Sequence, residues 1–141
     1  MEYRRFKDKI LVRMDPKDEI LHAVMQIAEK EKIELAECSA LGAVNDFTVG
    51  LYDLNQKKYL SNHYAFPAEI VSLWGTVSKN DGKPYLHIHM SAADGSGKVY
   101  GGHLNEAYIS VTCEMVITLI DGHADHRLSE ETGLNILDFE R

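Results

Sequence analysis

Three histidines, His87, His89 and His103, lie on either side of a glycine-containing turn in the segment YLHIHMSAADGSGKVYGGH. In a β-strand, side chains two residues apart point to the same face, so the first two imidazoles share the polar face of YLHIHMSA. Two imidazoles at this spacing can bind one divalent metal ion. If the strand after the turn pairs with the first as a hairpin, His103 approaches them. The two glycines before His103 would then leave room for a ligand or a close backbone contact.

The spacing leaves a second interpretation open, in which the histidines are polar residues of adjacent strands and hold no ion. Neither cysteine lies near them in the sequence, so a metal site here would consist of three imidazoles and a water molecule. An open fourth position is typical of catalytic zinc sites, whereas structural sites are closed by protein ligands. The predicted ligands are therefore His87, His89 and His103, and the expected metal is zinc or a similar divalent ion.

Other residues that could do chemistry are more isolated. Glu114 interrupts the apolar run VTCEMVI, where its carboxylate either supports a ligating histidine or faces solvent or another subunit. Tyr85 shares the face of the first two histidines. If the protein is an enzyme, Glu114 and Tyr85 are the candidates for proton transfer or substrate positioning; no catalytic residue is assigned. We interpret His123 and His126, in the segment GHADH, as surface residues of a loop, and Cys113 as a buried, unreactive thiol.

The elements that position these residues follow from hydrophobic periodicity. Residues 3–14 predict one strand, and DPKDEILHAVMQIAEKEKI predicts a helix with Asp15 as its N-cap and Pro16 in its first turn. The rest predicts strands: one to about Leu41, a second through Leu51, several more, and a central apolar strand in YISVTCEMVITLI. The tail predicts a loop and a short closing strand. We expect one α+β domain over residues 1–141, with a largely antiparallel sheet and one main helix.

Composition limits the class of function. The formal net charge is −7, and the lysines and arginines alternate with acids instead of clustering, so strong nucleic-acid binding is not expected. Two cysteines far apart in the sequence fit free thiols in a reducing compartment. The N-terminus lacks the apolar region of a secretory signal, and no apolar run is long enough to span a bilayer. We expect a soluble cytoplasmic protein without a membrane partner.

The segments CSALGAV, EIVSLWGTVS, HIHMSAADGSGKVYGGHL and CEMVI together resemble the plants-and-prokaryotes conserved (PPC) domain, in its stand-alone prokaryotic form. The resemblance implies an α+β fold, a largely antiparallel sheet and a homotrimer. It also implies a metal site, because metal-containing prokaryotic members have a histidine motif that corresponds to His87, His89 and His103. Prokaryotic members are called DNA-binding by analogy with plant proteins that carry AT-hooks. No AT-hook core, Arg-Gly-Arg-Pro, occurs in this sequence.

Three functions are compatible with these observations. The first is a homotrimeric metal-binding protein, with zinc or a similar ion, in a regulatory or ligand-binding role with a small-molecule or protein partner. The second is a metal-dependent enzyme, in which an open position on a three-histidine site would hold an activated water. The third is a protein-interaction scaffold without a metal.

Overall fold

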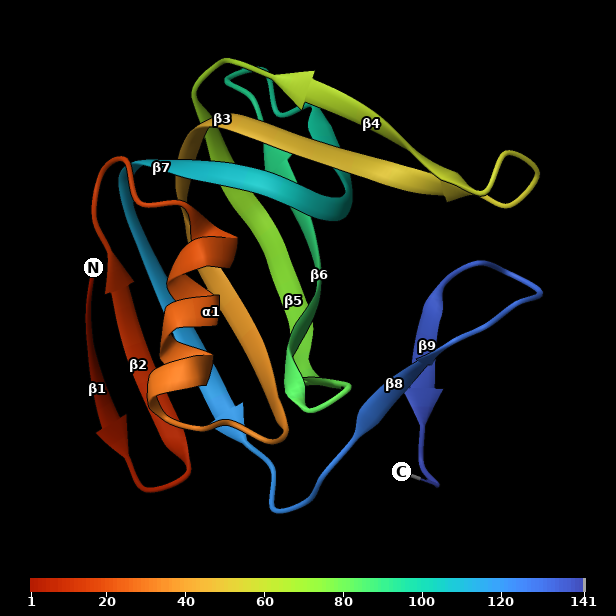
Figure 1. Ribbon diagram of the computed structural model, residues 1–141. Helices are drawn as coiled ribbons and strands as arrows, with labels where there is room; N and C mark the ends of the chain where they lie inside the picture. The colour runs from red at the N-terminus through yellow and green to blue at the C-terminus, as the bar shows by residue number, and fades with distance from the viewer. Residues whose placement is uncertain (141) are drawn as a thin grey trace.

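The computed structural model describes residues 1–140 as a seven-stranded antiparallel sheet, one helix and a separate two-stranded hairpin (Figure 1). The elements in chain order are β1 (Glu2–Phe6), β2 (Lys9–Met14), α1 (Ile20–Lys30), β3 (Ala36–Asp53), β4 (Lys58–Tyr64), β5 (Ala68–Asn80), β6 (Lys83–Ala93), β7 (Val99–Leu119), β8 (Asp125–Leu128) and β9 (Asn135–Asp138). The expected fold class, α+β with a largely antiparallel sheet and one main helix, is confirmed.

The seven strands lie in the order β1-β2-β7-β6-β5-β3-β4, and an additional pairing joins β7 to β3. This pairing closes β3, β5, β6 and β7 into a ring, which leaves the open edges of the sheet at β1 and β4. The long strand β7 makes the closure possible because its first residues pair with β6 and the remainder pairs with β3 and β2. As expected from its apolar sequence, β7 is central.

The strand β3 was expected as two strands separated by a bend near Leu41, and this expectation is wrong. One strand runs from Ala36 to Asp53, with register shifts against β5 and β7 on either side of Gly42. The bend is therefore a β-bulge within a continuous ladder. Gly42 is required there, since a Cβ at this position would lie 2.4 Å from the carbonyl oxygen of Thr112.

The N-terminal region also differs from expectation. Residues 3–14 form the hairpin β1–β2 instead of one strand, with Lys7 at positive φ in the turn. The predicted helix start at Asp15 is wrong as well. Pro16 and Lys17 occupy the centre of a β-turn closed by the bond from Asp18 N to Asp15 O, and the φ of +77° at Lys17 excludes a helix.

The helix α1 begins after Glu19, whose carboxylate accepts hydrogen bonds from the backbone N–H groups of Leu21 and His22. The same carboxylate accepts a bond from the backbone of Ala107 on β7, which ties the helix start to the sheet. The buried face of the helix consists of Ile20, Ala23, Val24, Ile27 and Ala28. This face packs with the inward residues of the strands in one hydrophobic core, so the helix covers the inner face of the sheet.

Both cysteines are free thiols in this core. Burial raises the pKa of Cys38 to about 12 and that of Cys113 to about 11. Neither thiol forms a reactive thiolate at neutral pH, which agrees with the prediction for Cys113. Within residues 1–140, the helix is too short and too polar to cross a membrane.

The tail was expected as a loop and one short strand, but it forms two paired strands. The β8–β9 hairpin lies beside β5 and β6, below the tip of the β3–β4 hairpin (Figure 1). Residues 129–134 connect its two strands, with Gly133 at a φ of +77°.

Candidate metal centre

The three predicted ligands lie on a single β-hairpin formed by β6 and β7. His89 and His103 are direct cross-strand partners in this hairpin. The turn between the strands is organised by Asp94, whose Oδ1 accepts bonds from the backbone N–H groups of Ser96 and Lys98. Its backbone N–H also donates to the carbonyl of Lys98. The turn thus fixes the register that brings His103 opposite His89.

The alternation along β6 also matches the prediction. Ile88 and Met90 are buried in the core, whereas His87 and His89 point to the opposite, outer face of the sheet. The glycine before His103 serves the close approach of two backbones, because a Cβ at Gly102 would lie 2.5 Å from the carbonyl oxygen of Gly50. Of the two uses foreseen for the glycines, the structure therefore shows the close backbone contact.

The three imidazoles converge. Their ring centroids are separated by 5.2 Å between His87 and His89, by 5.4 Å between His87 and His103, and by 5.5 Å between His89 and His103. One ring nitrogen from each lies within 4.8 Å of the others. Among the described residues, this is the only group of three His, Cys, Asp or Glu side chains with such geometry.

The surroundings of His87 and His103 lower the pKa of both side chains and so favour the neutral imidazole, which is the form that binds metals. Burial, together with the nearby His87 and His89, lowers the pKa of His103 to about 4. Burial also lowers the pKa of His87, with smaller contributions from His89 and His126. A cluster of imidazoles without a neighbouring carboxylate resists protonation, because each added charge would repel the next.

The three side chains fit a divalent ion. With metal–nitrogen bonds of about 2.0–2.1 Å, ligand nitrogens in a tetrahedral site are roughly 3.3 Å apart, so small side-chain rotations would close the observed spacing. Within residues 1–140, none of the three rings makes a hydrogen bond to another residue, and their nitrogens are available as ligands. Neutral imidazoles suit zinc, copper, iron and nickel.

Neighbouring elements supply the walls of the site. Tyr59 of β4 stacks on His103, with ring centroids 4.7 Å apart and planes inclined by 29°. Trp74 and Thr76 of β5 are the cross-strand partners of His89 and His87. An open cavity of about 600 Å³ adjoins the histidines, and it is also lined by Ser72, Ser91 and Leu137.

Other residues considered from the sequence have different roles. Glu114 does not support a histidine: it is exposed and lines a separate groove beside β1 and β2. Tyr85 contacts His126, with ring centroids 4.4 Å apart, and so braces the C-terminal hairpin. His123 is a surface residue as expected, and its Nδ1 lies 3.1 Å from a carboxylate oxygen of Glu34.

The prediction that His126 is a surface residue is wrong. Its side chain is 2% exposed, and its Nδ1 lies 3.0 Å from the carbonyl oxygen of Lys79. Since a carbonyl only accepts hydrogen bonds, Nδ1 carries the proton. The signal for this burial was absent from the local sequence, because GHADH is polar and the burial depends on the distant residues Ser78 and Tyr85.

The sequence matches the profile of the Plants and Prokaryotes Conserved (PCC) domain over residues 1–121. This is the domain called PPC above, and the chain belongs to this family. The match ends before the β8–β9 hairpin. Among curated protein sequences, none matches this chain.

Several solved structures are similar to the chain over nearly its whole length. A candidate DNA-binding protein from Bacteroides thetaiotaomicron is 25% identical, with a TM-score of 0.96 over 99% of this chain and 98% of the other. A metal-containing protein from Archaeoglobus fulgidus is 34% identical, with a TM-score of 0.86 over 96% and 95% of the two chains. A plant- and prokaryote-conserved protein from Pyrococcus horikoshii is 27% identical, with a TM-score of 0.85 over 97% and 93%.

Proposed function

We propose that this protein binds a divalent metal ion, zinc in the first instance, through His87, His89 and His103. The observation that carries the proposal is the convergence of three imidazole nitrogens within 4.8 Å on one hairpin. The description of the Archaeoglobus fulgidus relative as metal-containing supports it. The role that fits this site is a ligand-binding or regulatory one within a single domain.

The environment of the site supports ligand binding. An ion held by three imidazoles keeps at least one coordination position for a water or a ligand, and it acts there as a Lewis acid. The cavity beside the histidines has room for a small molecule, and Ser72, Thr76 and Ser91 offer hydroxyl groups along its wall. The same cavity favours a second candidate function, a metal-dependent enzyme that acts on such a molecule.

Elemental analysis tests the metal proposal. The protein is purified without a metal-affinity tag, beside a His89→Ala variant and a His63→Ala control. His63 is exposed, pairs with Asp46 and lies outside the cluster. We expect about one ion per chain in the wild type and in the control, and a loss of most of it in His89→Ala, because two imidazoles bind a divalent ion far more weakly than three. Metal-free wild-type protein that also takes up no added zinc would refute the proposal and favour a scaffold function.

We also propose that the chain forms a homotrimer through the outer face of the sheet. The helix covers the inner face, whereas strand register aligns outward residues of three neighbouring strands away from the histidine cavity: Leu11 on β2, Val116 on β7 and Ser39 on β3. Leu11 is 50% exposed, and the neighbouring Leu41 is 62% exposed. Apolar side chains of this size that remain exposed on a sheet are typical of a face that another subunit covers.

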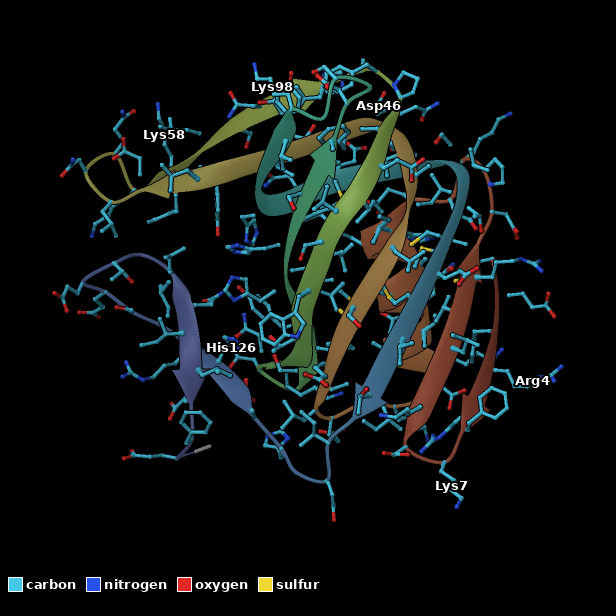
Figure 2. The ribbon with its side chains drawn as sticks, turned by 180° about the vertical axis from the view of Figure 1, so that it is seen from behind. Arg4, Lys7, Asp46, Lys58, Lys98 and His126 are labelled. Carbon is cyan, nitrogen blue, oxygen red and sulfur yellow. The ribbon has the colours of Figure 1, made fainter. Side chains whose placement is uncertain are left out.

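Direct nucleic-acid binding is not part of the proposal, despite the name of the Bacteroides thetaiotaomicron relative. The net charge of −7 opposes it. Arg4 and Lys7 lie at the β1–β2 edge, on the side of the molecule away from His126 and the C-terminal hairpin (Figure 2). Arg5 and Arg13 in the same region are paired with carboxylates of Glu31 and Asp15.

A further inference from the structure

We propose that the β8–β9 hairpin forms one wall of the ligand site and that the site takes a small carboxylate with an apolar body. In this arrangement the carboxylate binds the metal ion, and the apolar body lies between Trp74 of β5 and Leu137 of β9. The inference rests on the proposed metal binding and goes beyond it, because it names the ligand class and the residue that selects it.

The hairpin is fastened to the main sheet at one end by polar contacts, of which the one at His126 is buried. The backbone N–H of Lys79 donates to the carbonyl of Ala124, and the backbone N–H of Asp81 donates to the carboxylate of Asp125. Directly beside them, the imidazole of His126 donates to the carbonyl of Lys79. Figure 2 shows His126 between β8 and the strands β5 and β6. These contacts hold the start of β8 against the β5–β6 turn.

The connection between β8 and β9 is fastened at a second point, on the β3–β4 hairpin. The hydroxyl of Tyr52 donates to the carbonyl of Thr132 at 2.9 Å, and the ammonium group of Lys57 donates to the carbonyl of Glu130 at 3.1 Å. Because the two attachments lie on different elements, the hairpin spans from the β5–β6 turn to the tip of β3–β4 (Figure 1). The histidine cavity lies under this span, as Leu137 is one of its lining residues.

Strand register sets the position of Leu137. His126 and Leu137 are cross-strand partners, and partners in an antiparallel pair project from the same face. Because His126 is buried against β5, this face of the hairpin points toward the main sheet. The side chain of Leu137 points the same way. Leu137 remains 43% exposed, so its side chain borders open space that a ligand can fill.

The lining determines which ligand fits. A divalent ion with three neutral imidazoles retains its two positive charges, and among residues 1–140 no carboxylate lines the cavity to balance them. An anionic oxygen donor is therefore the complementary head group. Behind it, Trp74 and Leu137 offer apolar surface to the body of the ligand, and the volume of about 600 Å³ accommodates a ring-sized group.

The test uses the full chain loaded with Co²⁺, whose visible absorption reports a change of ligand at the ion. Benzoate is the probe, and acetate, which has the same head group without the ring, is the comparison. We expect benzoate to bind about tenfold more tightly than acetate, because burial of the ring removes apolar surface from water. Benzoate binding no tighter than acetate would overturn the proposed ligand class.

Two variants of Leu137 test the role of the hairpin, with Ile136→Ala as the matched control on the opposite face of β9. We expect Leu137→Ala to weaken benzoate binding about fivefold and to leave acetate binding unchanged, since only the apolar contact is lost. Leu137→Trp should exclude benzoate while acetate still binds, because the added ring occupies the cavity. Ile136→Ala should behave as the wild type.

The outcomes separate the two proposals. If Co²⁺ binds but both Leu137 variants bind benzoate as the wild type does, the hairpin is not a wall of the ligand site and this inference fails alone. If Co²⁺ does not bind to the histidines at all, the metal proposal fails and the ligand proposal fails with it.

Discussion

The pKa of His103 depends strongly on the residues around its ring. Tyr59 stacks on its ring, and His87 and His89 lie beside it. Burial and these imidazoles lower its pKa from the ordinary 6.5 to about 4. The candidate site thus contains an imidazole that stays neutral in mildly acidic solution, where an exposed histidine would be protonated.

This shift predicts how the stability of the metal-free protein depends on pH. Below pH 6.5 the unfolded chain protonates residue 103, whereas the folded chain keeps it neutral down to about pH 4. Unfolding therefore takes up a proton in this range, and the free energy of unfolding falls as the pH falls. We expect urea denaturation of the metal-free protein at pH 7 and pH 5 to show this loss, and His103→Gln to reduce it.

The comparison between the two proteins isolates the effect of His103, because the carboxylates titrate alike in both. Equal losses of stability in wild type and His103→Gln would contradict the pKa shift. His22→Gln is the matched control, since His22 is exposed on the helix and lies outside the histidine cluster.

At the residue scale, the placement of the three histidines was predictable because period-2 alternation is local. His87 and His89 point outward as the spacing required, and the turn around Asp94 returns the chain at the register that brings in His103. The walls of the site were not predicted. Leu137 and Tyr59 reach it through contacts between segments far apart in the sequence, which leave no periodic signal.

Among the elements, the helix α1 is connected to strand β7 by one side chain. Glu19 caps the helix and also accepts a hydrogen bond from the backbone of Ala107 on β7. Since its loss leaves backbone N–H groups without their acceptor, we expect Glu19→Ala to lower the free energy of unfolding by about 1–2 kcal/mol. Chemical denaturation at neutral pH measures this change.

Glu29→Ala is the matched control for this prediction, because Glu29 lies on the exposed side of the same helix. Its removal should change the free energy of unfolding by less than about 0.5 kcal/mol. A loss of the same size in both variants would mean that the effect does not come from the cap.

The helix itself was predictable from its apolar spacing, but its start was not. Asp15 and Pro16 have the residue types of a cap and a first turn, and the same types also suit a β-turn. The turn prevails because the backbone N–H of Lys17 donates to the carbonyl of Ile109, and the backbone N–H of Ile109 donates to the carbonyl of Asp18. These are long-range contacts with β7, which no local pattern contains.

For the whole molecule, one substitution on the outer face of the sheet tests the proposed trimer. Leu41 is exposed on this face beside its cross-strand partner Glu114. We expect Leu41→Glu to convert the proposed trimer to monomers, because it places a second negative charge in the contact. Light scattering coupled to size-exclusion chromatography measures the mass.

Leu54→Glu is the matched control, since Leu54 is similarly exposed, at 61%, but lies in the turn after β3. Its mass should equal that of the wild type. A Leu41→Glu variant that keeps the trimer mass would place the subunit contact elsewhere, and a monomeric wild type would refute the trimer.

The placement of all three imidazoles on the β6–β7 hairpin has a consequence for how the chain folds. Hairpins form within microseconds, whereas pairings between distant strands such as β3 and β7 require slow loop closure. The candidate site lies between residues 87 and 103 and needs only the local pairing. The proposed ion would therefore bind a nascent hairpin and hold its register, as a template around which the later strands assemble.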